Sequence, residues 1–249
     1  MIELYREQGL KIYEGSHYSH GEHIIEVKQI LSWYRLRRAR ILDIGCSSGL
    51  HAIEFAKKGY PVIGLDIEPS AIELARRRSR NTNNRIEFRV MDIERDDPSA
   101  LGKFDLIYSI GNVLSHVRKD SLPDILRKIR ECLNEDGVFL FDVLINAKPF
   151  QEEIHPGKNG LQIIWRRDID GGTGRISMDG TFLEYGFTQH FDVWGYMVEE
   201  MKRLLGSSGF SDIEYSETLD FTAKNKSKNP VSLYFRAKAA GTHTIPHGH

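Results

Sequence analysis

A turn of small residues and the carboxylates that flank it form the part of this chain best suited to chemistry. The turn reads Asp43-x-Gly45-x-Ser47-x-Gly49, and Asp66 ends the next apolar run. Glycines let a backbone turn sharply into a helix whose first amides point outward, and a carboxylate accepts hydrogen bonds from polar hydrogens. The pattern therefore predicts a ligand site at this turn.

The elements that must position these residues are two strands and a helix. The short apolar run Ile41–Ile44 predicts a strand, and residues 50–58 predict a helix that ends in two lysines followed by Gly59. Pro61 opens a second apolar run, which ends at Asp66. The unit is therefore expected to be βαβ, with two neighbouring parallel strands.

Three other interpretations of this turn must be weighed. A dinucleotide fingerprint needs a third glycine, where this chain has Leu50. Gly45-x-Ser47-x-Gly49 also spells the nucleophile elbow of a serine hydrolase, but an elbow follows several strands, and the residues upstream contain no strand-like run. A purely structural turn is the third alternative. The missing glycine argues against the dinucleotide, Asp66 would have no role in an elbow, and the pattern of residues downstream argues against a purely structural turn.

The chain continues with the elements of an open α/β sheet. Asp92 follows an alternating run, and Asn112 and His116 follow the next apolar run. Ser121 is the expected cap of a helix with apolar residues at helical spacing up to Leu133. The predicted strands are residues 86–90, 104–109 and 138–144, with a break at 134–137 before the last of them.

From residue 39 to residue 144, this order of motifs resembles the class I S-adenosylmethionine-dependent methyltransferases. The resemblance implies S-adenosyl-L-methionine as cofactor and S-adenosyl-L-homocysteine as product. It also implies that Asp66 holds the ribose hydroxyls and that Asp92 accepts from the adenine amino group. The full set of implied cofactor residues is Tyr13, Tyr18, Asp43, Gly45, Cys46, Ser47, Gly49, Asp66, Ile67, Met91, Asp92, Ile93, Ser109 and Ile110.

The stretch Gly111-Asn112-x-x-x-His116 resembles the glycine N-methyltransferase-like group of small-molecule enzymes. That resemblance places Asn112 near the acceptor and His116 near the methionine end of the cofactor, so these two are the catalytic candidates. A hydroxyl acceptor would need His116 as a general base, whereas an amine must arrive neutral. The rings of Tyr13 and Tyr18 could face the sulfonium, or they could anchor the N-terminal helix to the core.

The expected fold is α/β, a Rossmann-like doubly wound seven-stranded sheet with an antiparallel last strand and a β-rich insertion after the fifth strand. The final strands are joined without a helix, so they should form an antiparallel hairpin. The insertion should contain strands at 161–167, 175–178 and 181–191, with turns at 170–172 and 179–180. Its expected role is a substrate lid, with an oligomer interface or a plain surface hairpin as alternatives. The single methyltransferase domain, 1–249, divides into an N-terminal helical cap at 1–37, the cofactor core at 38–145, the insertion at 146–195, a final helix and strand pair at 196–238 and a disordered tail at 239–249.

Composition and net charge argue against several kinds of partner and site. A net charge of −1 argues against general affinity for nucleic acid or acidic membranes, and two cysteines suit a reducing cytoplasm. His17, His20 and His23 lack the ligand pattern of a metal site, so none is expected. The prediction is methyl transfer to nitrogen or oxygen of a small molecule, with homo-oligomerisation left open. The alternatives are a tRNA methyltransferase, suggested by the basic runs at 35–40 and 76–80, a non-catalytic S-adenosylmethionine-binding protein, and the disfavoured serine hydrolase.

Overall fold

The computed structural model describes residues 7–17, 21–34, 39–82, 85–145, 150–156, 160–221 and 231–240. Its larger sheet has seven strands in the order β10-β11-β5-β4-β1-β2-β3. Strands β3, β2, β1, β4 and β5 run parallel, whereas β11 pairs antiparallel with both β5 and β10. The predicted seven-stranded sheet and its antiparallel hairpin are confirmed. The strands are β1 (Ile41–Ile44), β2 (Val62–Asp66), β3 (Ile86–Val90), β4 (Phe104–Ser109), β5 (Leu133–Leu144), β10 (Phe210–Ser216) and β11 (Ser232–Ala239).

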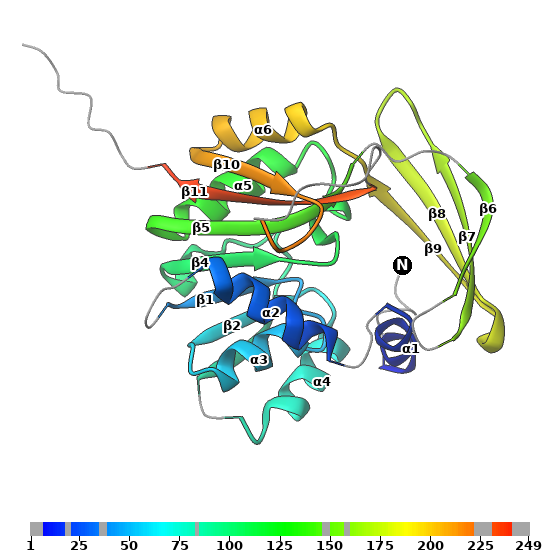
Figure 1. Ribbon diagram of the computed structural model, residues 1–249, viewed down its shortest axis with the longest axis horizontal. Helices are drawn as coiled ribbons and strands as arrows, with labels where there is room; N and C mark the ends of the chain where they lie inside the picture. The colour runs from blue at the N-terminus through cyan, green and yellow to red at the C-terminus, as the bar shows by residue number, and fades with distance from the viewer. Residues whose placement is uncertain are drawn as a thin grey trace, which may run out of the picture.

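Helices cover both faces of this sheet (Figure 1). Side chains alternate across each strand, so Leu106 and Tyr108 of β4 pack under one helical layer and Ile107 packs under the other. The first layer is α2 (Glu22–Trp33), α3 (Leu50–Lys57) and α4 (Pro69–Ser79), and the second is α5 (Leu122–Glu131) and α6 (Val198–Ser207). Within the described ranges, no helix is both long and apolar enough to cross a membrane.

The strand order reverses between β1 and β4. The chain adds β2 and β3 on one side of β1, then returns to add β4 and β5 on the other. Ligands of open α/β sheets bind outside the carboxyl ends of the strands at such a reversal. The turns that begin at Gly45 and Ile110 therefore flank the place where a ligand is expected.

Strand β5 is longer than the sequence pattern predicted. The expected break at 134–137 lies inside the strand, because Leu133 already pairs with Phe104 and pairing resumes between Leu106 and Val138 after a register shift. Asp136 takes a left-handed φ of 60° in this irregular stretch. The polar run is therefore a bulge-like interruption of a ladder and not the end of a helix.

The insertion is a separate four-stranded antiparallel sheet. It consists of β6 (Phe150–Pro156), β7 (Gln162–Ile169), β8 (Arg175–Phe182) and β9 (Phe187–Trp194) in sequence order. The predicted turn at 170–172 is present, but the one at 179–180 is wrong, since both residues pair inside β8. Gly180 serves packing, because a Cβ there would lie 2.7 Å from the ring of Trp165. The chain instead turns through the short helix η3 (Leu183–Tyr185), which divides the strand predicted at 181–191.

Helix α1 (Glu7–His17) lies between the two sheets (Figure 1). Its Ile12 and Tyr13 pack against Ile163 and Phe182 of the inserted sheet. The predicted helix from Glu22 is confirmed as α2, whereas α1 had not been predicted.

At the other end of the chain, Ala239 still belongs to β11, so the tail predicted from residue 239 starts too early. Residues 241–249 lie outside the described ranges.

Candidate active site

The turn after β1 is held in a conformation that needs glycine. Gly45 and Gly49 have φ values of 76° and 81°, and Ser47 between them is also left-handed at 49°. A Cβ on Gly45 would lie 2.5 Å from a methyl group of Val113, and one on Gly49 would lie 2.6 Å from the ring of Phe88. The glycines therefore allow both the turn and the close approach of its neighbours.

Asp66 fastens this turn to the end of β2. Its two carboxylate oxygens accept hydrogen bonds from the amides of Ser47, at 2.7 Å, and Glu68, at 2.9 Å. Burial raises the pKa of Asp66, and these amides oppose the rise. The next side chain, Ile67, is 65% exposed, so an apolar surface stands beside a carboxylate at the strand end.

Beneath the turn, Asp43 and Cys46 are buried. Burial raises the pKa of Asp43 to about 7, although the charge of His51 and a hydrogen bond from Tyr108 lower it. The thiol of Cys46 points toward Gly64, where an added Cβ would lie 2.9 Å from Sγ. The side chain of Cys46 therefore fills the core, and only its backbone belongs to the turn.

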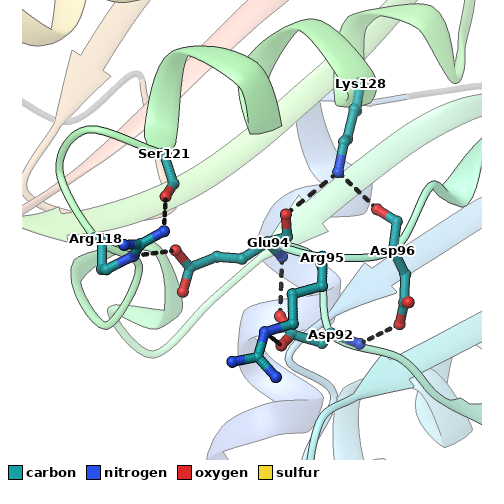
Figure 2. A network of polar contacts seen from close by, with 7 residues as sticks. All are labelled: Asp92, Glu94, Arg95, Asp96, Arg118, Ser121 and Lys128. Carbon is teal, nitrogen blue, oxygen red and sulfur yellow. Dashed lines mark hydrogen bonds and ion pairs between the residues drawn. The ribbon is translucent and has the colours of Figure 1, made fainter.

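The loop after β3 is fixed by polar contacts, as Figure 2 shows. The carboxylate of Asp92 accepts from the amide of Glu94 at 3.0 Å and pairs with Arg95 at 3.5 Å. Lys128 of α5 donates to the carbonyl oxygens of Glu94 and Asp96. The flanking apolar residues Met91 and Ile93 are partly buried against the core.

The turn after β4 is built on two buried side chains. Ser109 donates from Oγ to the carbonyl oxygen of Ile44 at 2.9 Å, which joins the ends of β4 and β1, and Ile110 is partly buried beside it. The amides of Gly111 and Asn112 both donate to Oδ1 of Asp142, at 2.8 and 2.9 Å. The side chain of Asn112 accepts from Ser232 of β11, so it serves at least in part to tie the turn to the sheet.

His116 lies where the core meets the insertion. It ends the short helix η2 (Val113–Ser115), and its ring centroid is 5.7 Å from that of Phe191 on β9. Burial lowers the pKa of His116 to about 4, so its imidazole is neutral near pH 7. The structure thus places this predicted residue between the turn after β4 and the inserted sheet.

Helix α1 is joined to the glycine turn by contacts that sequence reasoning missed. Glu14 forms a bidentate pair with Arg78, at 2.9 and 2.8 Å, and also accepts from the hydroxyl of Ser48. Tyr13, one helical position earlier, has a pKa raised to about 12 by burial and, to a smaller degree, by the charge of Asp142. Predicted Tyr18 lies outside the described residues. Spacing could not have revealed the Glu14 contacts, since 64 positions separate it from Arg78.

Comparisons with known proteins agree with this geometry. A family model described as a methyltransferase domain matches residues 41–137. A putative methyltransferase of Geobacillus sp. (strain WCH70) is 26% identical over 85% of this chain and 89% of its own length. A solved S-adenosylmethionine-dependent methyltransferase from Clostridium acetobutylicum matches with a TM-score of 0.77 at 16% identity, covering 94% of this chain and 98% of that one. CalS10, an amino pentose methyltransferase from Micromonospora echinaspora, matches with a TM-score of 0.69 at 19% identity over 96% and 100% of the two chains.

This chain is therefore similar to S-adenosylmethionine-dependent methyltransferases: residues 41–137 match a methyltransferase domain, and the fold is shared with the solved enzymes. The residues at the strand ends fit that cofactor. Asp66 and Asp92 offer carboxylate oxygens for hydroxyl and amino hydrogens, and exposed Ile67 offers an apolar surface between them in sequence. Among the residues that the structure describes, no three His, Cys, Asp or Glu side chains are grouped to hold a metal ion.

Proposed function

We propose that this enzyme methylates the amino nitrogen of a small molecule. The observation that carries the proposal is the position of α1 and the inserted sheet at the carboxyl ends of the core strands. The hydrogen bond from Ser48 to Glu14 joins α1 to the turn after β1, and the Phe191–His116 contact joins the inserted sheet to the turn after β4. The same interpretation makes the insertion a substrate lid, because the acceptor would lie between it and the cofactor.

The surroundings of the site favour a small acceptor over RNA. An RNA enzyme needs a basic surface that neutralises phosphates. Three of the four arginines of the run at 76–80 bond within the protein: Arg76 donates to the carbonyl oxygen of Phe88, Arg77 pairs with Glu73, and Arg78 pairs with Glu14. The net charge of −1 points the same way.

An amine suits these groups better than a hydroxyl. A hydroxyl acceptor needs a general base whose pKa lies near the working pH, and burial lowers the pKa of His116 to about 4. A neutral amine already carries its nucleophilic lone pair, and the charge that develops on nitrogen needs only a carbonyl or carboxylate oxygen to stabilise it. CalS10, whose acceptor is an amino pentose, covers 96% of this chain and so includes the inserted sheet.

Bound S-adenosylmethionine would supply the methyl group. The chain's own residues would bind the cofactor and the acceptor, orient them toward each other and exclude water. Asp66 and Asp92 are proposed to hold the ribose and adenine groups. The turn from Gly45 to Gly49 would face the methionine end. Neutral His116 would accept a hydrogen bond from the acceptor or orient it, while α1 and the inserted sheet cover the reaction.

The test uses S-adenosylmethionine with a labelled methyl group. The purified protein is incubated in parallel with a fraction of small metabolites and with total tRNA, and the labelled product is identified by mass spectrometry. Label on the nitrogen of a small molecule is expected. Label in tRNA or on an oxygen would refute the proposal, and cofactor binding without turnover in both pools would indicate a non-catalytic binder. An Asp66→Ala variant serves as the control for cofactor-dependent labelling.

A further inference from the structure

Asp142 is a buried carboxylate that no sequence motif marks. It lies near the carboxyl end of β5, between β4 and β11, and is 4% exposed. Its Oδ1 accepts hydrogen bonds from two consecutive amides, those of Gly111 and Asn112, at 2.8 and 2.9 Å. A carboxylate held in this way fixes the backbone of a turn, because both amides must point at one atom.

That turn is the neighbour of the glycine turn after β1. Gly111 and Asn112 have φ values of 101° and 58°, so the turn needs an external partner to hold its left-handed backbone. Val113 follows directly, and its side chain occupies the space beside Gly45, where a Cβ would lie 2.5 Å away. Asp142 therefore fixes the turn after β4, and Val113 of that turn packs against the glycine turn after β1, where the methionine end of the cofactor is proposed to lie.

Groups from three neighbouring elements interact electrostatically with Asp142. Burial and, to a smaller degree, the charge of Asp142 raise the pKa of Tyr13 of α1 and Tyr234 of β11, so both tyrosines are neutral at pH 8. Glu26 of α2 also acts on Asp142, but Glu26 is itself paired with His51 of α3 at 2.6 Å. Burial raises the pKa of Asp142 to about 6, with the two amides opposing the rise, so the carboxylate is ionised at pH 8. The ionised carboxylate of Asp142 would be stabilised by a cation at the adjoining site.

We propose that Asp142 is a positioning residue that also makes the cofactor site prefer a positively charged ligand. It holds the turn from Gly111 to Val113 against Gly45, and its negative charge favours the sulfonium of S-adenosylmethionine over the neutral thioether of S-adenosylhomocysteine. The two ligands share their adenine, ribose, amino and carboxylate groups and differ in the methyl group and the positive charge that it gives the sulfur. The change in the ratio of their dissociation constants when Asp142 loses its charge therefore reports on the sulfonium charge. The effect would help the product leave after each methyl transfer.

The experiment measures the dissociation constants of both ligands by calorimetry at pH 8, and it needs no acceptor. Asp142→Asn keeps the side-chain shape and one carbonyl oxygen for the amides but removes the charge. It should weaken S-adenosylmethionine binding about tenfold, with S-adenosylhomocysteine changed by no more than about twofold. Asp142→Ala removes the acceptor as well and should weaken both ligands, with Asp142→Asn recovering most of the affinity for the product.

The matched control is Asp105→Asn. Asp105 also accepts a backbone amide, from Arg40 at 2.7 Å, but it lies at the opposite end of β4. This variant should leave the ratio of the two dissociation constants unchanged. Equal losses for both ligands in Asp142→Asn, no loss for either, or the same change of ratio in Asp105→Asn would each overturn the proposal. Failure of the small-molecule acceptor assignment would leave this outcome unaffected.

Discussion

Replacing Gly45 with alanine should destabilise the protein by two separable effects. The φ of 76° costs an alanine about 1 to 2 kcal/mol, because its Cβ crowds the following carbonyl oxygen. The new Cβ would also lie 2.5 and 2.6 Å from the two methyl groups of Val113, and overpacking of this kind costs about 1 to 3 kcal/mol. The expected loss in the free energy of unfolding is therefore roughly 2 to 5 kcal/mol.

Two further variants separate these effects. Gly59 has a φ of 92° and no atom within 4 Å of an added Cβ, so Gly59→Ala reports the backbone cost alone. Val113→Ala removes the two methyl groups that a Cβ at position 45 would meet. In a double-mutant cycle, Gly45→Ala should therefore cost about 1 to 2 kcal/mol less in the Val113→Ala background.

The assay is urea unfolding followed by circular dichroism, with calorimetric titration of S-adenosylmethionine on the folded variants. Gly45→Ala should bind the cofactor more weakly than the wild type, whereas Gly59→Ala should bind it normally, because Gly59 lies beyond the far end of α3. Equal destabilisation by the two glycine variants, or a coupling of zero in the cycle, would refute the assignment of Val113 as the neighbour that excludes a side chain at Gly45.

Asp66→Ala should weaken S-adenosylmethionine binding by about 1 to 3 kcal/mol, since it removes an acceptor and releases the amide of Ser47; unchanged affinity by calorimetry would mean that Asp66 does not face the ribose. His116→Ala should lower turnover more than cofactor affinity, and the reverse result would make His116 a cofactor contact. Burial raises the pKa of Asp43 to about 7 in the folded state, above its unfolded value, so the folded protein binds this proton more tightly. This proton contributes at most about 4 kcal/mol to the free energy of unfolding. The contribution is fully present below about pH 4 and is lost as the pH rises through 7. Asp43→Asn should flatten the pH dependence measured by urea unfolding, and a profile that keeps the wild-type slope would contradict the assignment.

Local patterns sufficed for the core of the fold. Strands β1, β3 and β4 begin and end where the apolar runs do, and α3 and α5 follow the helical spacing of their apolar residues. The polar residues at 134–137 misled the prediction because their pairing partner, β4, is remote in sequence and fixes the longer strand. Asp179 and Gly180 looked like a turn, yet they pair on both sides with β7 and β9.

The order of the strands and helices, and the glycine turn with its acid at Asp66, could be predicted from local sequence, because hydrophobic period and backbone freedom act over a few residues. Only the tertiary structure brought Glu14 to Arg78 and Asp142 to the turn after β4. These contacts depend on which strands lie side by side and which side chains face inward at the strand ends. That arrangement follows from the reversal of strand order between β1 and β4, which the spacing of residues along the chain does not predict.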